Sequence, residues 1–223
     1  MNLVHPELCF KFSNIERKSL LLVIEAPSVF SQVLTELKNQ SEGNSGLFVL
    51  SEEEKIMPLD KNLKVIIDPL AFDPNDKIIL NAINKQVEED AINEYHYEAT
   101  NKLISMLKSY AIDLAYDFPG AITPVEEIPI NAIIKALSFH VDTLGNSLVE
   151  HIFDSVLSYN KYMHYSLFCF VNLMNFLPMN EITKLIESCI KESIAIMFIE
   201  AKDISIDKEL FQKVVIDTDF CQF

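Results

Sequence analysis

Three acidic residues stand where predicted strands end, at positions from which an α/β protein could hold metal ions. Glu25, Asp68 and Glu200 each follow a short apolar run. The carboxyl ends of parallel strands share one edge of a sheet, where the ligands of α/β proteins bind. Carboxylates gathered there would hold the two metal ions of a nuclease or phosphatase. The alternative, which we favour, is that a strand ends where charged residues begin.

A second acidic group lies around a turn in the middle of the chain. It consists of Asp113, Asp117, Glu126 and Glu127, which flank the Pro119-Gly120 turn. Calcium takes six to eight hard oxygen ligands, so carboxylates on such a loop suit this ion. The spacing is not that of an EF-hand, and a solvated acidic loop is the alternative interpretation.

Lysines in the same central part of the chain could contact a nucleic-acid backbone. A lysine is a flexible point charge that suits phosphate contact without reading bases. Arg17 is the one arginine, which argues against base recognition by bidentate arginine contacts. A solvated helix face is the alternative for any single lysine. The candidate DNA-binding residues are Lys85, Lys102, Lys108, Lys135 and Lys161.

Other chemistry is poorly supported by the sequence. Phosphate-binding loops need glycines where backbone amides approach the anion, and this chain has four glycines, with Glu25-Ala26-Pro27 after the first predicted parallel strand. The sequence has no Gly-x-Ser-x-Gly elbow and no histidine beside a candidate cysteine. We therefore predict no catalytic residue, no bound nucleotide and no enzymatic activity.

The overall charge argues against nucleic acid as a partner. The formal net charge is −15, with 33 acidic and 18 basic residues. Such a chain repels a polyanion on average. DNA binding therefore requires that the lysines gather on one surface, or that divalent cations neutralise part of the acid.

The elements that must position these residues alternate between strand and helix. Continuous apolar runs predict buried strands of a largely parallel sheet, and helical patterns lie at 28–39, at 180–192 and, shorter, near 207–212. This alternation predicts an α/β fold. The predicted strands are 20–25, 47–50, 63–68, 167–172, 194–200 and 214–217.

The middle of the chain breaks this alternation. Residues 75–118 contain neither glycine nor proline, and apolar residues recur there mostly at four-residue steps, which predicts one long helix over 76–110. Further helices are expected at 130–139 and 146–163, the latter with Asn146 as a possible cap. We thus predict a discontinuous α/β head domain, 1–76 and 166–223, and an all-helical leg insertion, 77–165.

The location of the protein follows from what the sequence lacks. No apolar run reaches the roughly 18 residues of a membrane helix, and residues 1–18 lack the order of a secretory signal. We expect a cytoplasmic protein with no membrane partner.

Several segments, in order along the chain, resemble one known family. They are 21–30 (LLVIEAPSVF), 64–73 (KVIIDPLAFD), 112–117 (IDLAYD), 133–137 (IIKAL), 159–162 (YNKY), 170–172 (FVN) and 197–200 (MFIE). Together they are similar to the spacer-acquisition protein of type II-A CRISPR systems, the Csn-two family. The resemblance spans roughly residue 20 to the C-terminus.

The resemblance implies an architecture and a function. The head would be related to P-loop ATPases without their nucleotide motif, and a helical leg would be inserted in it. The protein would form a homotetrameric ring that encircles the ends of linear double-stranded DNA, supported by calcium and acting beside other CRISPR adaptation and effector proteins in antiviral defence.

The family's site residues carry over only in part. Asp113 and Asp117 match its acidic leg motif, whereas Ala115 and Ala132 stand where acidic residues are usual. Lys135 and Lys161 match family lysines. We expect sequence-independent binding of linear DNA without catalysis, and the alternatives are an acidic protein-binding scaffold or a metal-dependent nuclease.

Overall fold

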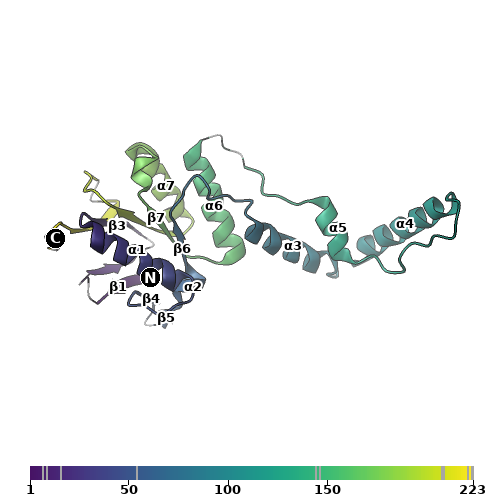
Figure 1. Cartoon of the computed structure of the whole chain (residues 1–223), viewed down its shortest axis with the longest axis horizontal. Helices are drawn as coiled ribbons and strands as arrows, with labels where there is room; N and C mark the ends of the chain where they lie inside the picture. Colours follow the sequence, from purple (N-terminus) through teal and green to yellow (C-terminus); the bar gives the residue numbers. More distant parts are fainter. Residues whose placement is uncertain are drawn as a thin grey trace. The chain divides into compact units, whose positions relative to one another are not determined.

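The computed structural model describes residues 1–6, 8, 10–15, 17–53, 55–143, 145, 147–206, 209–219 and 221. Its contacts divide the chain into two compact units. Unit 1 comprises residues 1–74 and 143–223, and unit 2 is the insertion 75–142. Each unit is described below by itself (Figure 1).

A parallel five-stranded sheet forms the centre of unit 1 (Figure 1). Its order is β6-β7-β8-β3-β9, and every neighbouring pair is parallel. The three central strands are buried at every position, as their continuous apolar runs predict. The predicted α/β fold is therefore confirmed. The strands are β3 (Ser19–Ile24), β6 (Leu63–Ile66), β7 (Leu167–Val171), β8 (Ala195–Glu200) and β9 (Phe211–Ile216).

A second, antiparallel sheet in unit 1 was not predicted. It has the order β2-β1-β4-β5, with strands β1 (Asn2–His5), β2 (Phe10–Ser13), β4 (Val49–Glu52) and β5 (Lys55–Met57). The predicted strand 47–50 thus contributes to this sheet and not to the parallel one. The Gln212 side chain of β9 accepts a hydrogen bond from Ser13 N at 3.2 Å and donates one to Ser13 O at 2.5 Å, which links the two sheets.

The helices of unit 1 are α1 (Pro27–Ser41), α2 (Leu59–Asn62), α6 (Leu148–Met163) and α7 (Met179–Lys191), with a short 3₁₀ turn, η1 (Leu173–Asn175). The predicted cap Asn146 lies outside the described residues. Ser147 instead caps α6 in a capping box with Glu150. Residues 207 and 208 also lie outside, and the helix predicted near 207–212 is wrong because Phe211 and Gln212 belong to β9.

Helix α6 belongs to unit 1, although we predicted it in the insertion. Its Ser155 hydroxyl donates to Phe72 O at 2.8 Å, and its Tyr159 ring stacks on Phe72 with centroids 5.1 Å apart. Ile152 and Val156 of α6 are fully buried as well. These contacts place the second boundary near residue 143 and not at 165.

Unit 2 contains α3 (Lys77–Ala91), α4 (Tyr97–Tyr116) and α5 (Ile130–Leu137). The single helix predicted over 76–110 is wrong, because the chain turns at 92–96. The Asn93 side chain accepts hydrogen bonds from the backbone N–H groups of Tyr95 at 3.0 Å and His96 at 3.1 Å. This local side-chain bonding competes with the helix, as asparagine does in Asx turns.

Helices α3 and α5 pack against each other in unit 2. Ile79 and Ile83 of α3 and Ile134 of α5 are its buried side chains. Asn75 pairs with the backbone of Val141 through bonds of 3.1 and 2.7 Å, which joins the two ends of the insertion. Within the described parts of both units, no helix is long and apolar enough to cross a membrane.

Candidate nucleic-acid interface

Four of the five candidate DNA-binding lysines lie in unit 2. Lys85 is on α3, Lys102 and Lys108 are on α4, and Lys135 is in the last turn of α5. Lys85, Lys102 and Lys135 are exposed, and Lys108 is half-buried. Among the described residues none of the four forms an ion pair with a carboxylate. Their charges are thus available to a phosphate backbone.

Lys161 lies in the other unit. It is exposed in the last turn of α6, where its ammonium group sits 5.4 Å from the centroid of the Tyr162 ring. Since Lys161 and the other four belong to separate units, neither unit by itself brings all five together.

The four carboxylates predicted to bind calcium do not converge within the chain. Asp113 lies on α4 and Asp117 follows one turn later as its C-cap, whereas Glu126 and Glu127 lie in the exposed segment before α5. Among the described residues no three His, Cys, Asp or Glu side chains are close enough to hold a metal ion together. Because calcium needs six to eight oxygens, these residues of a single chain do not form a complete site.

A hollow beside this segment has a different chemistry. Its cavity of about 380 Å³ is lined chiefly by apolar and aromatic residues and by no carboxylate: Ile112, Ala115, Tyr116, Phe118, Gly120, Ile122, Thr123 and Pro124. This surface suits apolar contact and not a cation.

Two of the three acidic residues at the strand ends accept hydrogen bonds from backbone N–H groups. The Asp68 carboxylate accepts hydrogen bonds from the backbone N–H groups of Leu70 at 2.9 Å and Ala71 at 3.3 Å. Glu200 ends β8, which lies two strands away from β6, the strand that precedes Asp68. The Glu200 carboxylate accepts a hydrogen bond from Met174 N of η1 at 3.1 Å. Glu25 follows β3, next to β8. The structure thus does not assemble the carboxylate cluster that a two-metal site requires.

Burial governs the chemistry of Glu200. Its side chain is 2% exposed, and this desolvation raises the pKa of its carboxyl to about 7, although hydrogen bonds from the backbone of Met174 and Leu173 act in the opposite direction. A carboxyl group that is partly protonated at neutral pH and already bonded to backbone is a poor metal ligand.

Helix α4 carries the feature that the sequence analysis did not identify. None of its residues is buried, although it contains Leu103, Met106, Leu107, Tyr110 and Leu114. The four-residue apolar period showed that a stripe exists. It could not show that these side chains remain exposed.

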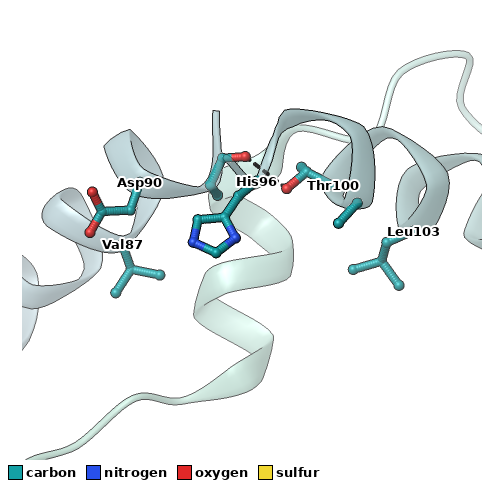
Figure 2. Close-up of a pocket in the computed structure, with 7 residues that line it drawn as sticks. Val87, Asp90, His96, Thr100 and Leu103 are labelled. Carbon is teal, nitrogen blue, oxygen red and sulfur yellow. Dashed lines mark hydrogen bonds between the residues drawn. The ribbon is translucent and has the colours of Figure 1, made fainter. Parts of the chain in front are cut away.

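A recess lies at the start of α4, where α3 and α4 meet. Figure 2 shows Val87 and Asp90 of α3 on one side, His96 between, and Thr100 and Leu103 of α4 on the other. The recess has a volume of about 390 Å³. The Thr100 hydroxyl of α4 donates to Ala91 O of α3 at 2.7 Å, the dashed line in Figure 2, and so links the two helices.

Comparison with known proteins supports one family. The family model described as "CRISPR-associated protein (Cas_Csn2)" matches residues 40–220. A relative named CRISPR-associated protein Csn2, from Streptococcus agalactiae, is 25% identical over 206 residues, covering 86% of this chain and 88% of the relative.

A solved structure has the same fold. The crystal structure of Stu0660 of Streptococcus thermophilus matches with a TM-score of 0.54 and 9% identity, over 96% of this chain and 74% of that chain. Because the family model covers well over half of the sequence, this protein belongs to the Csn2 family of CRISPR-associated proteins.

Proposed function

We propose that this protein binds linear double-stranded DNA, independently of sequence, as a homotetrameric ring that acts in CRISPR spacer acquisition in the cytoplasm. The observation that carries the proposal is that the four candidate lysines of unit 2, Lys85, Lys102, Lys108 and Lys135, form no ion pair with a carboxylate among the described residues. Membership of a CRISPR-associated family supplies the biological context. Other CRISPR adaptation and effector proteins are its proposed protein partners.

Lysine chemistry supports binding without base recognition. Lys85, Lys102, Lys108 and Lys135 are spread over three helices of one unit, so they can follow a phosphate backbone. Because each phosphate contact releases counterions, affinity falls steeply as salt rises.

Assembly overcomes the unfavourable net charge. A single copy carries −15, so its average field repels DNA. A ring that directs the lysines of several copies into one channel, with the carboxylates outside, makes the field locally positive. The proposal therefore ties binding to assembly.

The topology of the DNA tests this proposal. A ring that threads onto ends binds a linear duplex and does not bind the same duplex as a covalently closed circle. Gel shifts with both forms at several salt concentrations measure this difference. Equal affinity for both forms would refute threading.

Charge reversal tests the interface and the alternative scaffold function. Lys135→Glu combined with Lys161→Glu should abolish detectable DNA binding, because attraction becomes repulsion at two sites of each copy. Lys191→Glu, on the exposed surface of α7, is the matched control and should bind as the parent does. Unchanged binding by the double variant would instead favour an acidic scaffold that binds proteins.

Calcium enters the proposal only as an ion shared between copies. Asp113 and Asp117, one turn apart, supply part of a ligand set, and a second copy must supply further oxygens. Calorimetric titration with calcium chloride should then show binding by the assembled protein that Asp113→Asn removes. The absence of heat from the assembled protein would exclude calcium.

We propose no reaction for this protein. Asp68 and Glu200 are engaged with backbone N–H groups, which removes the support for the nuclease alternative. Incubating labelled DNA with the protein and magnesium or manganese should leave it intact. Cleavage that Glu25→Gln abolishes would overturn this conclusion.

A further inference from the structure

Strand β6 forms an open edge of the parallel sheet in unit 1. It pairs with β7 on one side, and no strand in the described part of the chain pairs with its other side. The opposite outer strand, β9, is linked to β2 by the side chain of Gln212. An open edge presents backbone N–H and C=O groups to any extended segment that can pair with it. The kind of ligand that suits β6 is therefore a further strand.

The edge of β6 lacks one common form of protection. Edge strands are often kept from pairing by a lysine that stands over the edge. The ammonium group of Lys64, in the middle of β6, instead lies 4.6 Å from the centroid of the Tyr159 ring of α6. Ile67, which directly follows β6, is 49% exposed. An apolar side chain thus stands at the edge where a charged one would discourage contact.

A groove beside this edge could receive side chains of an added strand. Its cavity of about 250 Å³ lies between the last turn of α1 and the alternate residues Leu63, Val65 and Ile67. Leu63 and Val65 also pack with the core on the α1 face of the sheet. Side chains of a strand point to opposite faces in turn, so every second side chain of an added strand would enter this apolar groove.

The charge of the groove indicates the chemistry of its ligand. The charged side chains that line it are Lys38, Lys64 and Glu42, so basic groups outnumber acidic ones in a chain whose formal net charge is −15. Lys38 is exposed and forms no ion pair among the described residues. A second copy paired edge to edge would bring the same lysines together, which like charges oppose. The groove therefore favours an acidic segment of another protein.

We infer that the open edge of β6 binds an extended segment of a different protein, in which apolar residues alternate with acidic ones. The segment adds to the sheet beside β6, with its apolar side chains in the groove and its acidic side chains near Lys38 and Lys64. The inference is independent of DNA binding, because it uses none of the candidate DNA-binding lysines.

A model peptide tests the site. The probe is a fluorescein-labelled synthetic peptide in which valine and glutamate alternate, and fluorescence anisotropy measures its binding to the full chain. Ile67→Asp should weaken binding roughly tenfold or more, because it places a carboxylate against an acidic ligand. Ile56→Asp is the matched control, since Ile56 is 77% exposed on β5, an edge strand of the other sheet, and it should bind as the parent does. Circular dichroism checks that both variants remain folded.

Charge reversal at the rim tests the electrostatic part. Lys38→Glu should weaken binding of the same peptide roughly threefold or more, and the effect should shrink as salt rises. Lys191→Glu on α7 is the control and should bind as the parent does. Unchanged binding by Lys38→Glu would contradict the assignment of an acidic ligand.

Backbone methylation tests whether the peptide binds as a strand. Alternate residues of an edge strand direct their N–H groups to the neighbouring strand, and the residues between direct theirs away. One peptide is therefore methylated at the nitrogens of its valines, and a second at those of its glutamates. One of the two should bind roughly tenfold or more weakly, and the other should bind as the unmodified peptide does. Equal effects in both would refute strand pairing.

The remaining outcomes also decide the inference. A parent protein that does not bind the unmodified peptide would overturn it. Displacement of the peptide by a linear duplex would mean that the lysines of the groove bind phosphate. A smaller particle mass for Ile67→Asp in light scattering would mean that a second copy covers the edge. Each of these results would overturn the inference, whereas threading onto DNA ends is decided separately by the comparison of linear and closed duplexes.

Discussion

Strand β8 and helix α4 are both rich in large apolar side chains, but they differ completely in burial. Every residue of β8 is buried between its neighbours β7 and β3. No residue of α4 is buried. The difference indicates that β8 contributes to the stability of the single chain, whereas α4 leaves its apolar side chains exposed.

The largest expected effect lies in the core of unit 1. Phe198 of β8 is fully buried, and its ring lies 6.2 Å from that of Phe170 and 5.8 Å from that of Phe211. Phe198→Ala should lower the free energy of unfolding by about 3–5 kcal/mol, because it removes apolar contacts and leaves a cavity. Urea denaturation measures the loss. Phe176→Ala, at a residue 44% exposed, is the matched control and should cost far less.

The next effect depends on pH and arises at the end of the same strand. Burial raises the pKa of Glu200 from 4.5 to about 7, so the folded state binds this proton more tightly than the unfolded state. The contribution of Glu200 is therefore fully present below the unfolded pKa and is lost as pH rises towards about 7. Ionisation of a buried carboxyl group destabilises the fold.

Glu200→Gln should remove this pH dependence. The amide oxygen can still accept the hydrogen bond from Met174 N, but the side chain never ionises. Relative to the parent, the variant should gain as much as about 3 kcal/mol between about pH 4 and pH 8, measured by urea denaturation. Glu187→Gln, exposed on α7, should show no such gain. Parallel stability profiles for parent and Glu200→Gln would disprove the linkage.

The sequence predicts the parallel sheet well and the rest of the fold less well. The buried strands can be recognised in the sequence by their continuous apolar runs, as in β7 and β8. The strands of the antiparallel sheet are short and half-exposed, so they lack that signal. The break between α3 and α4 at Asn93 was not predicted, because the apolar period continues on both sides of it. The Asx turn that causes the break depends on the side chain of Asn93 alone.

The candidate site was likewise predicted only in part. Lysine side chains are usually exposed because they are charged. The structure shows this for Lys85, Lys102 and Lys135. The predicted gathering of Asp113 with Glu126 requires tertiary contacts that sequence spacing does not determine, and the single chain does not provide it. The apolar period of α4 also does not reveal whether its apolar side chains pack within their own unit or remain exposed.

A smaller effect is expected at the start of α6. Ser147 Oγ accepts from Glu150 N at 3.4 Å, and the Glu150 carboxylate accepts from Ser147 N at 3.1 Å. Ser147→Ala should lower the free energy of unfolding by about 1 kcal/mol, because the capping box is lost. The same change at Ser105 of α4 is the control and should be neutral or slightly stabilising, since alanine is the better helix former. Equal losses at both positions would show that α4 is as constrained as unit 1.

The smallest effect is expected in α4 when the protein is dilute. Leu114 of α4 is 47% exposed, and Leu114→Ala removes no contact that holds a single copy together. In protein diluted until it is monomeric, its free energy of unfolding should stay within about 0.5 kcal/mol of the parent. At concentrations where the parent assembles, the same substitution should lower the apparent stability, because binding between folded copies adds to it by mass action. Thermal unfolding over a dilution series measures both regimes. A loss of equal size at every concentration would mean that α4 packs within its own chain, and the contrast between β8 and α4 would disappear.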